Sequence, residues 1–234
     1  MKLLIVQPDP GCTADRYGTW LTEAGAELST CGPYAGDEVP PQVDGGGLVV
    51  LGGHMGAMDD HEFPWLADVR ALMRSSADRG VPTLGICLGA QLLAAACGGQ
   101  VEVGRRGIEA GVVEVRWRDE AAEDALVSAL PDPFPGPSMH RDAIAQLPSG
   151  AVWLGQTALY PYQAFRVHER AWGVQFHPEV SLPSFTDWRH QVSEEQWDAY
   201  GVDGDAVVEQ LRERDDEVAA AGEQLAKRFA TVAG

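Results

Sequence analysis

A single cysteine stands between two glycines where an apolar run meets a stretch of small residues. Cys87 is the central residue of the segment 85–89 (Gly-Ile-Cys-Leu-Gly), which completes the apolar run 82–86. A strand that ends in Gly-x-Cys-x-Gly and passes straight into a helix is typical of a nucleophile elbow, with cysteine in place of serine. The sharp turn needs small neighbours, and the N-terminus of the helix favours the thiolate. Cys87 is therefore the predicted nucleophile, and the alternative is a buried structural cysteine at a tight turn.

A histidine and a glutamate two residues apart follow another apolar run. The segment 172–179 reads Trp-Gly-Val-Gln-Phe-His-Pro-Glu, so His177 and Glu179 point to the same side of an extended chain. Pro178 restricts its own φ to about −65° and biases His177 toward an extended conformation. A thiolate nucleophile needs a base, and the base needs an orienting group. We expect His177 to be that base and Glu179 to orient it.

The third requirement is an oxyanion hole, in which backbone N–H groups stabilise the negative charge of the reacting oxygen. Leu88 follows the nucleophile and is predicted to supply one N–H group. The apolar run 48–51 opens into the pair Gly52-Gly53, and we expect Gly53 to supply the second. The alternative is a flexible turn. A phosphate-binding loop is excluded, because no Gly-Lys-Ser/Thr follows.

The elements that must position these residues alternate along the first half of the chain. The short apolar runs 3–6, 48–51 and 82–86 are typical of buried parallel strands. Between them, residues 13–24 and 64–79 carry apolar side chains at helical spacing. Strands that alternate with helices predict an α/β sheet built from βαβ units.

The second half of the chain is richer in strand patterns. Five segments are predicted to be strands, part of them antiparallel: 101–103, 112–115, 151–154, 163–167 and 172–176. The proline-rich segment 131–137 is predicted to be an exposed connection without regular structure. We find no internal repeat and no Gly/Ser linker that would mark a second globular domain.

The C-terminal segment differs in composition. Residues 193–217 hold ten acidic residues against Arg212 and Arg214, a local charge of −8. Apolar residues at helical spacing continue to Val232, which predicts an amphipathic helix with an acidic face in solvent. We therefore divide the chain into a domain at 1–192 and a helical acidic extension at 193–234 packed on it. A docking surface for a partner is the alternative.

Composition narrows the classes of partner. The chain has 234 residues, 17 Lys plus Arg, 35 Asp plus Glu and a net charge of −18, which argues against nucleic acid and anionic lipid. No apolar run is long enough to cross a membrane. The four cysteines lack CxxC spacing and resemble no metal site, so we expect no metal and a reducing, cytoplasmic location.

These motifs, in this order, resemble those of the class I glutamine amidotransferases, the triad family with Cys, His and Glu. The likeness covers most of the chain and is greatest to stand-alone proteins similar to the glutamine amidotransferase domain of GMP synthase. It implies a flavodoxin-like fold, in which helices flank a mostly parallel central sheet with a nucleophile elbow, plus a helical C-terminal extension. It also implies that the chemistry needs no cofactor.

The resemblance further implies a reaction and a binding site. Cys87 would attack the γ-carboxamide of glutamine, ammonia would leave with a proton from His177, and water would release glutamate. By position, Gly52 and Gln91 would contact the glutamine. Two positions differ from the family pattern, since His54 stands where proline is usual and His140-Arg141-Asp142 stands where His-Gly-Asp is usual.

The two departures leave roles open. We expect His140 and Arg141 to bind substrate, with Arg141 on an α-carboxylate; the alternative is that Arg141 points into solvent. His54 either contacts the substrate or caps the turn.

Three functions are compatible with these residues. The first is a glutamine amidotransferase or glutaminase that delivers ammonia to an acceptor; no Walker-type loop is present, so a separate synthase subunit would have to use the ammonia. The second is a hydrolase of γ-glutamyl peptides or other γ-glutamyl amides, with water as the acceptor. A closed pocket would favour the first and an open groove the second. The third is a catalytically idle binding protein, against which the complete triad argues.

Overall fold

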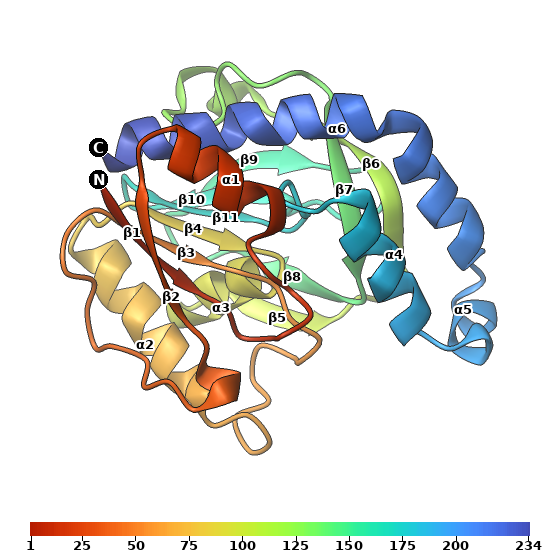
Figure 1. The fold of residues 1–234 in the computed structure, drawn as a ribbon, viewed down its shortest axis with the longest axis horizontal. Helices are drawn as coiled ribbons and strands as arrows, with labels where there is room; N and C mark the ends of the chain where they lie inside the picture. The colour runs from red at the N-terminus through yellow and green to blue at the C-terminus, as the bar shows by residue number, and fades with distance from the viewer.

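One sheet of nine strands forms the centre of the molecule (Figure 1). The computed structural model describes all residues, 1–234. The strand order is β2-β1-β3-β4-β11-β10-β9-β6-β7. The first five strands in that order are parallel: β2 (Glu27–Cys31), β1 (Lys2–Val6), β3 (Gly47–Val50), β4 (Thr83–Ile86) and β11 (Ala171–Val174).

The remaining strands extend the sheet in antiparallel fashion. They are β10 (Ala164–Val167), β9 (Val152–Gln156), β6 (Glu109–Trp117) and β7 (Phe134–His140). A separate two-stranded sheet pairs β5 (Gln100–Val103) with β8 (Asp142–Gln146). This confirms the α/β fold class and the antiparallel strands predicted for the second half. The strand predicted at 101–103 forms as β5, outside the main sheet.

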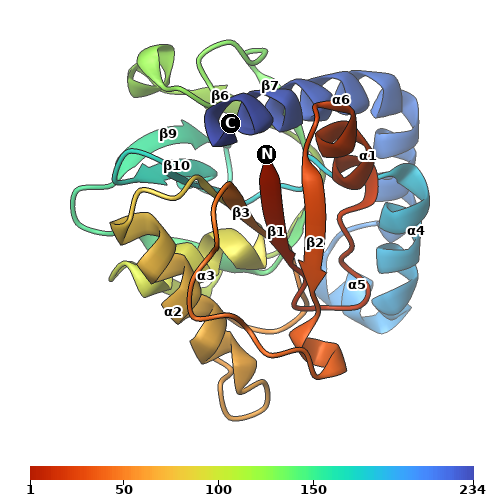
Figure 2. The same ribbon diagram turned by 60° about the vertical axis from the view of Figure 1, so that its left-hand side comes forward.

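Helices cover both faces of the sheet (Figures 1 and 2). One face packs on α1 (Asp15–Glu23) and α6 (Gly204–Ala233), and the other on α2 (Trp65–Asp78) and α3 (Leu88–Ala96). Successive side chains of a strand point to opposite faces of the sheet, so one short apolar run contributes to both cores. Val49 joins the core under α1 and α6, whereas Val50 joins the core under α2 and α3. This is why the buried strands are apolar without a break.

The predicted helices form where the sequence pattern placed them. Residues 13–24 and 64–79 become α1 and α2. The C-terminal region holds three helices: α4 (Leu182–Gln191), α5 (Glu194–Tyr200) and α6. Gly201 adopts a left-handed conformation that ends α5 and separates it from α6. On α6, the fully buried Leu225 and Phe229 each contribute about 2–3 kcal/mol of burial free energy. The helical extension is thus packed on the sheet, while a domain boundary at residue 192 stays a prediction.

The prediction for the proline-rich segment 131–137 was wrong. Residues 134–137 of this segment are the first part of the buried edge strand β7, which pairs with β6 over seven residues. Pro137 accepts a hydrogen bond from the backbone N–H of His177 at 2.7 Å, so its main-chain polar atoms face away from β6. Pro135, two residues earlier, faces the same way, and neither proline interrupts the β6–β7 ladder. Prolines are compatible with an edge strand under this condition.

Short 3-10 helices occur at Pro33–Ala35 and Asp119–Glu123. None of the helices has both the length and the apolarity that crossing a membrane requires.

Candidate active site

Cys87 occupies a strained turn between β4 and α3. Its φ is 51° and its ψ is −106°, a conformation that costs an L-residue about 1–3 kcal/mol. Both flanking positions require glycine, because backbone atoms of other residues lie very close to them. A Cβ atom on Gly85 would lie 2.4 Å from the carbonyl oxygen of Gly89, and one on Gly89 would lie 2.1 Å from that of Val50. The predicted nucleophile elbow is therefore present.

His177 reaches the same edge of the sheet because β11 lies beside β4. The two strands are parallel, with Val174 opposite Ile86, so the residues that follow each strand emerge together. The backbone N–H of Cys87 donates to the carbonyl of Val174 at 2.8 Å. The hydrogen bond from the backbone N–H of His177 to the carbonyl of Pro137 on β7 then anchors the backbone of the histidine. Adjacent parallel strands thus bring together two residues 90 positions apart in the sequence.

The imidazole of His177 is held by Glu179. Its Nδ1 lies 2.8 Å from Oε1 of Glu179, and both side chains are buried. The ring also packs against Trp188, with ring centroids 4.6 Å apart. The predicted pairing of these two residues across Pro178 therefore occurs in the structure, with Nε2 on the opposite side of the ring from Glu179. The expected extended chain was wrong, because the backbone N–H of Val180 donates to the carbonyl of His177 at 3.3 Å and closes a turn over residues 177–180.

The charge state of His177 follows from its neighbours. Burial by itself lowers the pKa of His177, but the charges of Cys87 and Glu179 and hydrogen bonds to both outweigh burial and raise the pKa to about 10. Below that pH, the imidazolium persists beside the nucleophile. A proton is therefore available on His177 for a leaving group at neutral pH.

The two predicted oxyanion donors lie on neighbouring segments. Leu88 is the first residue of α3, so its N–H group has no acceptor within the helix. Gly53 follows β3, and its N–H group has no acceptor within the protein. A Cβ atom on Gly52 would lie 2.8 Å from Cε1 of His177, and one on Gly53 would lie 2.8 Å from Cδ2 of Leu88. Glycine at both positions allows this loop to approach the nucleophile.

Asp9 organises that loop and was missed in the sequence. Its Oδ2 accepts a hydrogen bond from the backbone N–H of His54 at 3.1 Å and contacts Nδ1 of the same histidine, while Oδ1 accepts from Gly11 at 2.7 Å. His54 thus helps to cap the turn, and its ring also lines the cavity. The signal for Asp9 was its place three residues after the first predicted strand, at the edge of the sheet where Cys87 emerges.

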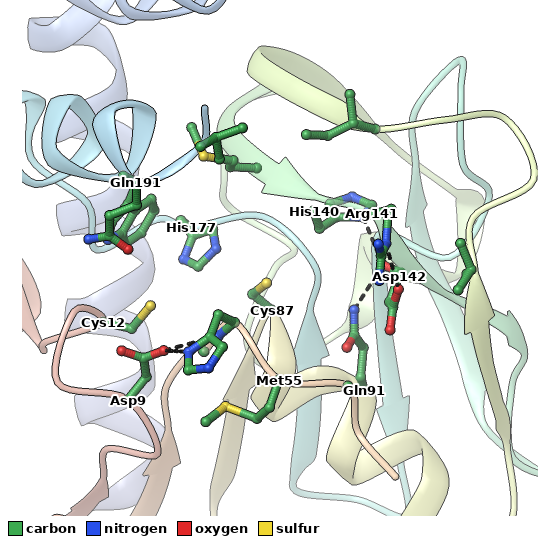
Figure 3. Close-up of a pocket in the computed structure, with 18 of the residues that line it drawn as sticks. Asp9, Cys12, Met55, Cys87, Gln91, His140, Arg141, Asp142, His177 and Gln191 are labelled. Atoms are coloured by element: carbon green, nitrogen blue, oxygen red, sulfur yellow. Dashed lines mark hydrogen bonds and ion pairs between the residues drawn. The ribbon is translucent and has the colours of Figure 1, made fainter. Parts of the chain in front are cut away.

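One cavity of about 640 Å³ is lined by most of the predicted site residues (Figure 3), namely Gly53, Cys87, Gln91, His140, Arg141 and His177. Gly52, Leu88 and Glu179 are not among its lining residues. Two groups of side chains flank Cys87 in this view. On one side lie Gln91, His140, Arg141 and Asp142. On the other side lie Asp9, Cys12, His177 and Gln191.

Some polar atoms of the substrate-binding residues predicted on the first side already form hydrogen bonds within the protein. Nε2 of Gln91 donates to the carbonyl of Asp142 at 2.9 Å. His140 contacts the same carbonyl through Nδ1 at 2.9 Å and Glu109 through Nε2 at 3.0 Å, so neither ring nitrogen is free for a substrate. Arg141 lines the cavity with a side chain that is 58% exposed and makes only a long contact, 3.5 Å, with the carboxylate of Asp142. Arg141 is therefore the group on this side that can meet the carboxylate of a substrate.

Cys12 is a second cysteine in the site, and no motif in the sequence indicated it. It lines the same cavity as Cys87, whereas Cys31 and Cys97 do not. Burial, reinforced by the charges of Asp9, Cys87 and Glu179, raises the pKa of Cys12 far above that of an ordinary thiol. Cys12 therefore remains a neutral thiol beside the nucleophile. The cavity holds no cluster of side chains suited to a metal ion.

The geometry places a cysteine in a strained turn beside a buried histidine–glutamate pair at the edge of a parallel sheet. The family model for glutamine amidotransferase class-I matches residues 33–188, and the chain belongs to this family. Sequence relatives include a GMP synthase [glutamine-hydrolyzing] of Thermobifida fusca, 42% identical over 105 residues that are 44% of this chain and 19% of the relative. Another is a GMP synthase [glutamine-hydrolyzing] of Methanoregula boonei, named as one subunit of that enzyme, 37% identical over 44% of this chain and 55% of the relative. The match thus spans about a fifth to a half of these relatives.

Solved structures show the same fold at low sequence identity. A glutamine amidotransferase from Thermotoga maritima superposes with a TM-score of 0.82 and 23% identity, over 98% of each chain. A glutamine amidotransferase from Methylobacillus flagellatus superposes with a TM-score of 0.84 and 23% identity, over 100% of this chain and 95% of the other. Both alignments include the C-terminal helical region.

Proposed function

We propose that the protein hydrolyses the γ-amide of glutamine through a covalent γ-glutamyl thioester on Cys87. The observation that carries this proposal is that the strained Cys87 and His177 line one cavity, with the buried Glu179 holding Nδ1 of His177. Family membership supports the same chemistry. A complete triad argues against the idle binding protein.

In the first half of the reaction, the Cys87 thiolate attacks the γ-carbonyl carbon. The N–H groups of Leu88 and Gly53 stabilise the oxyanion that develops. The C–N bond then breaks, and the leaving nitrogen takes a proton from the imidazolium of His177. Glu179 keeps the ring oriented and balances its charge, leaving a thioester on Cys87.

In the second half, water releases the acyl group. His177, now neutral, takes a proton from the attacking water, and the bond between carbon and sulfur breaks. Glutamate leaves, and the thiolate–imidazolium pair is restored. The glutamyl part binds on the side of Gln91 and Arg141, where Arg141 can pair with the α-carboxylate.

The ammonia requires an acceptor if the protein is a transferase. The relative from Methanoregula boonei is named as one subunit of a GMP synthase, which supports a partner for this chain in the form of a separate synthase polypeptide. We propose that this synthase polypeptide binds to the acidic outer surface of the 193–234 extension. The four cysteines are free, which supports a reducing, cytoplasmic location.

A second candidate is a hydrolase of larger γ-glutamyl amides. Glutamine has ten non-hydrogen atoms and fills roughly 200 Å³ at about 20 Å³ per atom. The cavity of about 640 Å³ has room for an additional group. This volume favours a substrate whose amine component is larger than ammonia, with water as the acceptor.

The test is an assay of ammonia and glutamate release from glutamine by the purified protein. We expect Cys87→Ala to abolish turnover with the melting temperature close to that of the parent, and Cys97→Ala to retain it as the matched control. Undiminished turnover by Cys87→Ala would remove the nucleophile from the proposal. A rise in glutaminase activity on addition of a synthase polypeptide would identify a transferase.

A further inference from the structure

The imidazole of His177 is held between two side chains of one short segment, residues 179–188. Glu179 binds Nδ1 of the ring, and Trp188 packs on the ring with centroids 4.6 Å apart. The carboxylate of Glu179 has no further partner, since its Oε2 is buried without a hydrogen bond. The position of this carboxylate therefore depends on how the backbone of the segment 179–188 is fixed.

The N-terminal end of α1 fixes the start of this segment. The backbone N–H of Arg16 donates to the carbonyl of Glu179 at 3.2 Å. Oδ2 of Asp15 accepts from the backbone N–H of Ser181 at 2.7 Å. Arg16 is itself anchored, because its Nη2 lies 2.6 Å from Oδ2 of Asp215 on α6, which packs beside α1 (Figures 1 and 2). Two adjacent residues thus connect the segment to the helices on one face of the sheet.

The loop that precedes α1 fixes the far end of the segment. Nε1 of Trp188 donates to the carbonyl of Gly11 at 2.8 Å. Ser181 is the N-cap of α4, the helix that carries Trp188. The hydrogen bond from Ser181 to Asp15 therefore lies between the two groups that flank the histidine, two residues after Glu179 and at the start of the helix that brings Trp188 to the ring.

Asp15 holds a backbone conformation that its own helix does not need. Its φ is 41°, in the left-handed region that L-residues seldom adopt, and among the non-glycine residues only Cys87 and His168 also have a positive φ. The N-cap of α1 is Ala14, and the sole hydrogen bond of the Asp15 carboxylate is the one from Ser181. Strained residues persist where the surrounding structure over-determines them, and they cluster at functional sites. The conformation of Asp15 therefore directs its carboxylate to the segment beside the histidine.

We propose that Asp15 is a positioning residue of the active site. By accepting the N–H group of Ser181, it fixes the segment 179–188 and so holds the imidazole of His177 in place. This inference rests on the acyl-enzyme chemistry proposed above. Asp15 does not line the cavity, so it acts on the reaction through the histidine and the two side chains that flank the ring.

Two substitutions of Asp15 separate the hydrogen bond from the charge and from the strain. Asp15→Asn removes the charge but keeps an oxygen that can accept from Ser181, and asparagine tolerates the left-handed conformation. Asp15→Gly removes the acceptor, while glycine adopts the same conformation without strain. His168→Gly, at an exposed turn residue with a φ of 52°, is the matched control for replacing a left-handed residue by glycine.

The first readout is the steady-state hydrolysis of glutamine from pH 5 to 11 by the full-length variants. We expect Asp15→Gly to lower kcat by about ten-fold or more, with KM within about three-fold of the parent, because the imidazole is displaced while the glutamyl side is untouched. Its alkaline limb should move to lower pH by about 0.5–1 unit, since Glu179 then acts less strongly on His177. Asp15→Asn and His168→Gly should resemble the parent in both respects.

The second readout is the pKa of His177, from an NMR titration of its Cε1–H resonance, which needs no turnover. The charges of Cys87 and Glu179 and hydrogen bonds to both raise this pKa to about 10, and Asp15 is not among the causes. We expect the pKa to fall by about 0.5–1 unit in Asp15→Gly and to match the parent in Asp15→Asn. A direct effect of the Asp15 charge would appear in both variants.

Each other result would contradict the assignment. An unchanged His177 pKa in Asp15→Gly would overturn the positioning role, and a lower melting temperature without that change would show that Asp15 is structural only. Equal shifts in Asp15→Asn and Asp15→Gly would refute the hydrogen bond as the cause. Absence of glutamine hydrolysis by the parent would overturn the proposed function, while the NMR titration would still decide the role of Asp15.

Discussion

Replacing Glu179 by glutamine removes the charge that holds His177 as an imidazolium while keeping a side chain of similar shape. The distance of 2.8 Å between Nδ1 and Oε1, with both groups buried, makes this a strong interaction. An opposite charge at such a distance shifts a pKa by about 1–3 units, equivalent to about 1.4–4 kcal/mol. Since the pKa of His177 is raised to about 10, the variant should have a His177 pKa between about 7 and 9.

The direction of the pH effect follows from the role of the proton. In the proposed mechanism acylation needs His177 protonated, so we expect activity to fall as the pH rises through the pKa of His177. In Glu179→Gln, the alkaline limb of kcat/KM should therefore move to lower pH by about 1–3 units. The value of kcat should also drop by about 10²–10⁴-fold, because the ring loses its orienting carboxylate.

The assay is glutamate release from pH 5 to 11, with the circular dichroism spectrum of each protein recorded to show that it is folded. Glu195→Gln, on the exposed surface of α5, is the matched control and should behave as the parent. An alkaline limb at the same pH in Glu179→Gln, together with kcat within a few-fold of the parent, would refute the assigned coupling of Glu179 and His177.

Three further outcomes are expected. A glutamine-like chloroketone should alkylate Cys87 before the other three cysteines, whose thiol pKa values are raised chiefly by burial; peptide mapping that finds equal labelling would contradict this. Glu109→Gln removes the carboxylate bound to His140 at 3.0 Å, so the KM for glutamine should rise about ten-fold with a smaller change in kcat; an unchanged KM would show that this pair does not position the binding side. Gly89→Ala should destabilise the fold by about 3 kcal/mol or more, because its Cβ atom would lie 2.1 Å from a backbone oxygen. Gly18→Ala, whose nearest neighbour would be 3.9 Å away, should be neutral or stabilising in urea denaturation.

The chemistry-bearing motifs were predictable because each is a short, local arrangement. The turn at Cys87 needs glycines on both sides whatever packs around it, and His177 and Glu179 are separated by Pro178 alone, within one turn of the chain. The buried parallel strands were equally predictable from the sequence, because a strand covered on both faces must be apolar throughout. These features depend on neighbours in the sequence.

Other parts of the site depend on residues that are distant in the sequence. The prolines near Pro137 gave a wrong expectation, because whether a missing N–H matters depends on which side of the strand faces a partner. Asp9 has no motif, and its importance comes from the loop that folds over it. His140 was predicted to meet the substrate, yet Glu109 and the Asp142 carbonyl take both of its ring nitrogens.

By itself, the sequence determined the α/β fold class, the elbow at Cys87 and the His177–Glu179 pair, since these follow from periodicity and from local backbone sterics. Only the tertiary structure decided that Cys12 lines the cavity, that Arg141 rather than His140 is available to a substrate, and that the cavity exceeds the volume of glutamine. Packing between distant segments sets which polar atoms are already paired and how much space remains, and no local pattern encodes either quantity.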